Sequence, residues 1–166
     1  MQVHVRSDVA GLLADVVARE LPSRNGLSAW ASFLRAHATL MRRLELDLAQ
    51  ATGLALADFD VLAQLAGAGG ELRMTDLAAR ALLSRSGMTR RVARLVDEGL
   101  VRRTATDADG RGVVVTLTDA GVTRLTETAP VHLRGVSELF VAQLDEQELA
   151  ALKSALDKVT VDCTFG

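Results

Sequence analysis

Residues 84–117 read SRSGMTRRVARLVDEGLVRRTATDADGRGVVVTL. Its apolar residues recur at helical spacing from Met88 to Val96, and Gly99 ends the series. Two short runs rich in β-branched residues follow at 101–105 and 112–117, with a turn-rich loop between them. The stretch therefore predicts a helix followed by a β-hairpin.

The residues just before this stretch complete a motif. Leu77, Ala78 and Ala81 are spaced as on one face of a short helix, for which Thr75 is the predicted N-cap. A polar turn at 84–87 separates this helix from the next one. A helix, a tight turn, a second helix and a hairpin form the order of a winged helix-turn-helix.

The remaining segments predict a mainly α fold with a small β-hairpin wing. Ser28 is the predicted N-cap of a long helix that ends at Gly53. After the wing, Thr118 caps a helix that Pro130 starts, kinks or breaks, and a capping-box pattern at 145–148 opens the last helix. The expected parts are an amphipathic extension at 1–26, a helical dimerisation region at 27–53 and 119–162, and a winged helix-turn-helix DNA-binding lobe at 54–118.

The charge of the chain is unevenly distributed. The 166 residues carry a formal net charge of −2, which by itself does not suggest a nucleic-acid partner. Residues 73–111, however, contain nine arginines and five acidic residues, a local balance of +4 that leaves −6 on the rest. Such asymmetry between segments indicates contact with a polyanion.

Other features exclude several classes of function. The three histidines have no zinc-site spacing, and with a single cysteine, Cys163, no disulfide or CxxC motif can form. We expect no redox role for Cys163, no cofactor and no metal. No P-loop, nucleophile elbow or catalytic triad pattern occurs, so an enzyme is not expected. Without a signal peptide or a long apolar run, a cytoplasmic protein that does not enter the membrane is expected.

The second helix of the motif carries the predicted contacts with DNA. Arg90 and Arg94 lie one turn apart on its exposed face, where an arginine can form paired bonds with guanine. Ser86 and Thr89 lie at its N-terminus, which suits phosphate. Arg111 at the hairpin tip can enter the minor groove, held by Asp109. The predicted DNA-binding residues are Thr75, Arg85, Ser86, Gly87, Thr89, Arg90, Arg94, Asp109 and Arg111.

Four stretches of the chain resemble the MarR family of bacterial transcription regulators. They are MTDLA at 74–78, LSRSGMTRRVARLVDEGLV at 83–101, DADGRG at 107–112 and LTDAG at 117–121. The resemblance implies a homodimer with intertwined terminal helices and two lobes that grip adjacent turns of duplex DNA. It also implies a recognition helix carrying Ser86, Thr89, Arg90 and Arg94, a wing-tip Arg111 and an orienting Asp109. Gly110 stands where the family often has another arginine.

The resemblance also implies a small aromatic or anionic ligand that binds between the dimer helices and the DNA lobe. Binding of this ligand would release a repressor from its operator. Trp30, Phe33 and His37 share one helix face, and a core stripe explains that spacing equally well. The predicted lining residues are Trp30, Phe33, His37, Phe59, Asp60 and Arg91.

Two classes of function therefore compete. The first is a homodimeric regulator, most simply a repressor, that reads a pseudo-palindromic operator in duplex DNA. The second is a winged-helix module that binds an acidic protein, which would show weak and sequence-independent affinity for DNA.

Overall fold

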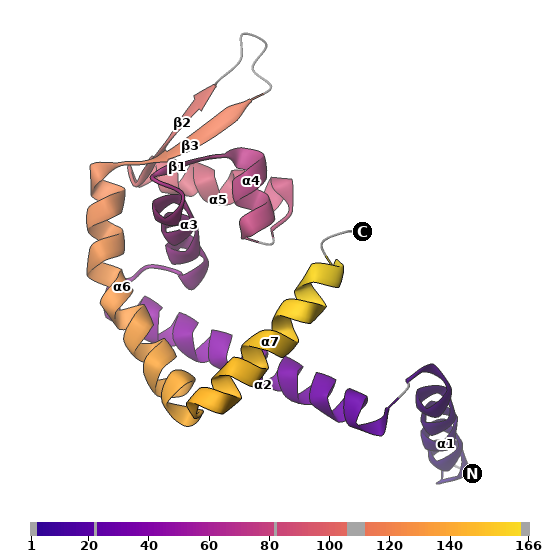
Figure 1. The fold of residues 1–166 in the computed structure, drawn as a ribbon. Coiled ribbons are helices and arrows are strands. Elements are labelled where there is room, and N and C mark those ends of the chain that lie inside the picture. The colour runs from indigo at the N-terminus through magenta and orange to yellow at the C-terminus, as the bar shows by residue number, and fades with distance from the viewer. Residues whose placement is uncertain (1–2, 22, 82, 106–111, 164–166) are drawn as a thin grey trace. The chain divides into compact units, whose positions relative to one another are not determined.

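The computed structural model describes residues 3–21, 23–81, 83–105 and 112–163 (Figure 1). The chain divides into two compact units, Met1–Arg42 and Arg43–Gly166. The long helix α2 (Arg24–Thr52) contributes to both.

The first unit consists of α1 (Val3–Glu20) and the first part of α2. The predicted N-cap at Ser28 is wrong, because α2 begins at Arg24 and Ser28 lies within the helix. Its hydroxyl donates to the Asn25 carbonyl at 3.0 Å, and the Gly26 N–H already donates to Ser23 at 3.1 Å. Asn25 and Gly26 thus lie within the first turn of α2.

The second unit contains the lobe built on the motif. Figure 1 shows α3 (Leu56–Gly67), α4 (Met74–Arg80) and α5 (Arg85–Asp97) beside a small antiparallel sheet. Its strands β1 (Glu71–Arg73), β2 (Val101–Ala105) and β3 (Val113–Leu117) lie in the order β1-β3-β2. The predicted fold class, mainly α with a small wing, is confirmed.

The core of the lobe lies where α3, α4 and α5 meet the sheet. Its fully buried side chains are apolar and come from all three helices and from the sheet. Each contributes about 1.5–3 kcal/mol to folding by leaving water. They are Val61, Leu62 and Leu65 on α3, Leu77 on α4, Met88, Val92 and Leu95 on α5, Val101 on β2 and Val115 on β3.

The predicted cap of α4 is also wrong. The helix begins at Met74 with Arg73 as its N-cap residue, and no side chain caps it. Thr75 instead lies in the first turn, where its hydroxyl donates to the Asp76 carboxylate at 3.3 Å. The reason is that Met74 is buried in the core, so the chain passes from β1 into α4 without an intervening residue.

After the wing, α6 (Asp119–Leu139) begins as predicted, with the Thr118 hydroxyl accepting from the Gly121 N–H at 3.0 Å. Pro130 lies inside this helix. The expectations that it starts or breaks the helix are therefore wrong. The helix continues because residues on both sides of the proline, Ala129 and Val131, pack against the core.

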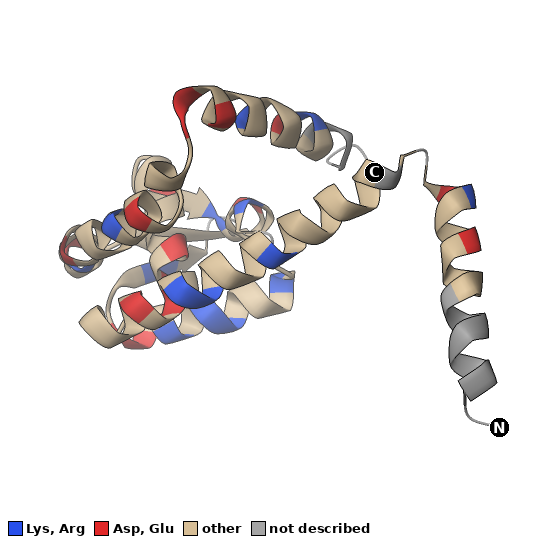
Figure 2. Cartoon of the chain, turned by 90° about the horizontal axis from the view of Figure 1, so that it is seen from below, with Lys and Arg blue, Asp and Glu red and all other residues tan. Residues whose placement is uncertain are grey.

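A short 3₁₀ turn, η1 (Val141–Gln143), leads to α7 (Glu146–Cys163). The predicted capping box is confirmed, since the Asp145 carboxylate accepts from the Glu148 N–H at 2.8 Å and the Glu148 carboxylate accepts from the Asp145 N–H at 2.9 Å. Acidic residues gather in the first turn of α7, where they favour the helix dipole (Figure 2).

Two side chains join the end of α2 to its neighbours. The Glu45 carboxylate accepts from the Leu56 N–H at 3.0 Å and so satisfies a free donor at the start of α3. Arg124 of α6 donates to the Thr52 carbonyl at the carboxyl end of α2. These bonds fix the lobe to α2 and α6 at both ends of the α2–α3 connection.

Candidate nucleic-acid interface

The helix α5 carries most of the residues that are predicted to contact DNA, and its two ends and its buried side are well defined. Its N-cap residue Ser84 accepts from the Gly87 N–H at 3.1 Å, and Gly99, with a φ of 74°, lies just beyond its end. Met88, Val92 and Leu95 are completely buried, which fixes the rotation of the helix about its axis. The side chains on the opposite side of α5 therefore have defined directions.

The outward side presents Ser86, Thr89 and Arg90, all exposed. The Thr89 hydroxyl donates to the Arg85 carbonyl at 2.9 Å, and the hydroxyls of Ser84 and Ser86 lie 3.3 Å apart. These contacts orient the hydroxyls and leave acceptor capacity for further bonds. Three predicted DNA-binding residues thus share one exposed surface.

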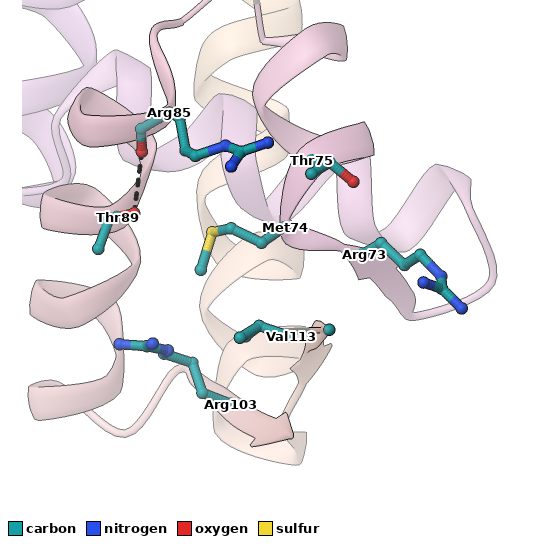
Figure 3. A pocket seen from close by; sticks show the side chains of 8 residues that line it. Arg73, Met74, Thr75, Arg85, Thr89, Arg103 and Val113 are labelled. Atoms are coloured by element: carbon teal, nitrogen blue, oxygen red, sulfur yellow. Dashed lines mark hydrogen bonds between the residues drawn. The ribbon is translucent and has the colours of Figure 1, made fainter. Parts of the chain in front are cut away.

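One flank of α5 faces a hollow of about 220 Å³ between this helix, α4 and the sheet. In Figure 3, Arg85 extends from α5 towards Thr75, and Arg103 extends from β2 towards α5. The guanidinium of Arg73 points away from the other two. The guanidinium groups of Arg85 and Arg103 supply hydrogen-bond donors that suit the oxygen atoms of phosphate groups. The hollow is lined by Arg73, Met74, Thr75, Arg85, Thr89, Arg103, Gly112 and Val113.

Arg73 and Arg103 were not among the predicted DNA contacts. Strand β2 pairs Arg103 with Val115, which is buried, so Arg103 points to the side of the sheet on which the lobe helices pack. Arg73 ends β1, the strand on the other edge of β3. The alternation in β3 could have identified Arg103 once the register was known, whereas the strand order is not visible in the sequence.

The other flank of α5 faces α3, and there the structure holds an ion-pair cluster. The Asp58 carboxylate, with 4% of the residue exposed, accepts from Arg91 Nη1 at 2.8 Å. Arg94 Nη2 donates to both oxygens of Asp58, each at 2.6 Å. The hydrogen bond and charge of Asp58 raise the pKa of Arg94 above its ordinary value. Arg94, predicted to read guanine, therefore has the end of its side chain turned towards α3.

The predicted wing-tip residues Asp109 and Arg111 lie outside the described residues. Gly87 lies in the first turn of α5, where a Cβ would be 3.1 Å from the Ser84 hydroxyl. Its small size thus fits the capped end of the helix.

The predicted ligand residues fall into the two units. In the first, the rings of Trp30 and Phe33 stack at 5.9 Å and those of Phe33 and His37 at 6.2 Å. In the second, Phe59 is buried in the core and its ring contacts His132 at 4.6 Å. Asp60 accepts from Gln64 at 3.5 Å, and Arg91 is paired with Asp58.

Within the described residues, no helix is both long and apolar enough to cross a membrane. The same part of the chain contains no group of three histidine, cysteine or acidic side chains placed to hold a metal ion.

A short helix, a second helix with a capped and exposed N-terminus, and a three-stranded wing define a winged helix-turn-helix protein. Comparisons with known proteins specify the family. The profile of the MarR family matches residues 52–112. Sco3205 from Streptomyces coelicolor, a MarR family transcriptional regulator solved in complex with DNA, is 31% identical over 83% of this chain and 87% of that chain, with a TM-score of 0.77. The chain belongs to the MarR family of transcriptional regulators.

Two further solved structures agree. AbsC, a MarR family transcriptional regulator from Streptomyces coelicolor, is 29% identical and has a TM-score of 0.80, covering 87% of this chain and 97% of that chain. A MarR mutant from E. coli complexed with operator DNA is 26% identical over 81% of this chain and 96% of that chain, with a TM-score of 0.70. A comparison with the curated proteins finds no significant match.

Proposed function

We propose that the protein is a homodimeric repressor that binds a pseudo-palindromic operator in duplex DNA. The observation that carries this proposal is the hollow beside α5, where Arg85, Arg103 and two threonines surround a space next to the exposed N-terminus of the recognition helix. The structures of Sco3205 in complex with DNA and of the MarR mutant with operator DNA support DNA as the partner.

In this proposal, one group of residues contacts the phosphates and another contacts the bases. Arg73, Arg85 and Arg103 contact backbone phosphates and so set the position of the lobe on the duplex. Arg90, with Ser86 and Thr89, points away from the core and enters the major groove, where it reads base edges. In this proposal Arg111 anchors the wing in the adjacent minor groove, and Asp109 orients it.

Exposed apolar side chains on the first unit support a homodimer. Leu12 and Leu13 of α1 are 68% and 63% exposed, and Trp30 of α2 is 55% exposed. Large apolar side chains that stay exposed on one chain indicate an interaction surface, and a two-fold axis lets the same side chains cover their copies. Two lobes related by that axis would match two operator half-sites one helical turn apart.

A small aromatic or anionic ligand that releases the repressor is a further part of the proposal. Its support is the exposed stack of Trp30, Phe33 and His37, which offers ring faces to a planar molecule. As a regulator of transcription, the protein would act in the cytoplasm.

The salt dependence of binding tests the assignment of the phosphate contacts. Each phosphate neutralised contributes a slope of about −0.9 to log K against log salt concentration. We expect Arg85→Gln and Arg103→Gln each to make the slope shallower by about one such contact. Arg134→Gln, which removes an exposed arginine of α6, should leave the slope unchanged. Equal slopes for all four proteins would contradict the assignment.

A further inference from the structure

The buried carboxylate of Asp58 sits between two arginines of the recognition helix. It accepts three hydrogen bonds, one from Arg91 and two from Arg94, across a sequence separation of 33 and 36 residues. The side chain of Asp58 is 5% exposed, whereas that of Arg94 is 52% exposed. The acid is thus fixed inside the lobe, and the arginine approaches it from the DNA-facing surface.

The contact with Asp58 makes Arg94 different from Arg90 in its freedom to bind DNA. The Nη2 atom of Arg94, at the tip of the side chain, is 2.6 Å from both oxygens of Asp58, so its charge is compensated and its tip faces α3. Arg90 lies one turn earlier and borders the same surface hollow of about 530 Å³ as Arg91 and Arg94. Within the described part of the chain, Arg90 forms no hydrogen bond or ion pair.

Stability alone is a weak reason for this cluster. A buried ion pair often contributes no more to folding than apolar side chains of the same size. The cluster is also incompletely satisfied, since Arg91 Nε is buried without a hydrogen-bond partner among the described residues. Such a network is a costly way to join α3 to α5. Its effect on the DNA-facing charge is the more specific consequence.

We propose that Asp58 withholds Arg94 from DNA and thereby limits how strongly the recognition helix binds duplexes of any sequence. The inference rests on the proposed function. Sequence-independent affinity comes from phosphate contacts, and each additional contact strengthens it for every sequence alike. Asp58 holds Arg91 and Arg94, so Arg90 is the arginine of this hollow that is left to contact DNA. The share of the affinity that depends on base sequence therefore increases.

The first test compares two arginine substitutions in the otherwise unchanged protein. Binding to a duplex of random sequence is measured over a series of salt concentrations. On a duplex that lacks the operator bases, Arg90 contributes its charge as one phosphate contact. Arg90→Gln should therefore weaken binding about tenfold at 0.1 M salt and remove about 0.9 from the slope. Arg94→Gln should change neither by a measurable amount. An equal loss for both variants would overturn the proposal.

The second test releases Arg94. Asp58→Asn should strengthen binding to the random duplex about tenfold and steepen the slope by about 0.9, and adding Arg94→Gln should reverse both changes. Asp76→Asn is the matched control, because it removes one exposed negative charge from the neighbouring helix α4 without touching an arginine of α5. A slope in Asp58→Asn equal to that of Asp76→Asn would overturn the proposal.

The two tests also separate this inference from the proposed function. If the unaltered protein binds no duplex, the proposed function fails and the inference fails with it. If it binds with a clear salt dependence and the Asp58 and Arg94 variants behave as their controls do, the inference alone fails. Should Asp58→Asn not fold, as judged by its thermal unfolding, the comparison of Arg90→Gln with Arg94→Gln decides.

Discussion

Among single residues, Gly121 has the least room for a side chain of all the glycines that the structure describes. A Cβ built on it would lie 2.1 Å from the Leu100 carbonyl oxygen and 2.8 Å from Leu117 Cδ1, so the start of α6 can touch the wing only with glycine there. We expect Gly121→Ala to lower the free energy of unfolding by about 3 kcal/mol or more, because the backbone must move. Gly67→Ala, where nothing lies within 4 Å, should be neutral or slightly stabilising. Unfolding in urea measures both, and equal midpoints would contradict this account.

His132 gives the stability of the protein a pH dependence. Burial lowers its pKa below the ordinary value of 6.5, while the charge of Asp60 partly opposes the shift. The unfolded chain therefore binds a proton more readily than the folded protein, and the contribution of neutral His132 is lost as the pH falls below about 6.5. We expect the thermal midpoint to drop between pH 7.5 and pH 5, and the drop to be smaller in His132→Gln. Identical drops in the two proteins would contradict the assignment.

Among the elements, the recognition helix has an N-cap, Ser84, whose contribution to stability can be measured by substitution. Ser84→Ala removes the acceptor for the Gly87 N–H and should cost about 1 kcal/mol of stability. Ser84→Asp keeps an acceptor at the same position and adds favourable charge at the helix N-terminus, so it should retain most of the stability. Chemical denaturation compares the three proteins, and a loss in Ser84→Asp as large as in Ser84→Ala would argue against the cap.

Elements whose signals are local were predictable from the sequence. The apolar series of α5, the Thr118 cap and the capping box at Asp145 each depend on residues within a few positions of one another. The caps at Ser28 and Thr75 were predicted wrongly, because burial of Met74 and the helical turn at 23–26 determine where those helices begin.

The candidate site was only partly predictable for the same physical reason. The exposed positions of Ser86, Thr89 and Arg90 follow from the periodicity of one helix. The pairing of Arg94 with Asp58 joins residues 36 positions apart, and the hollow requires β1 and β2 to flank β3. Helical spacing placed Arg94 with Arg90 on one exposed face, and only the position of α3 shows that its tip is held.

At the scale of the whole molecule, self-association is the first property to measure. Sedimentation should give twice the 17.7 kDa of one chain. Removal of residues 1–22, which precede the start of α2, takes away the exposed leucines of α1 and should weaken the dimer. A truncated protein that sediments as the same species at every concentration would show that α1 does not contribute.

Selection of bound duplexes from a random pool shows whether the dimer reads duplex DNA by sequence. We expect enrichment of a two-fold symmetric motif whose half-sites are about one helical turn, or 10 base pairs, apart. Recovery of duplexes with no common motif would contradict it and would favour a winged-helix module that binds an acidic protein.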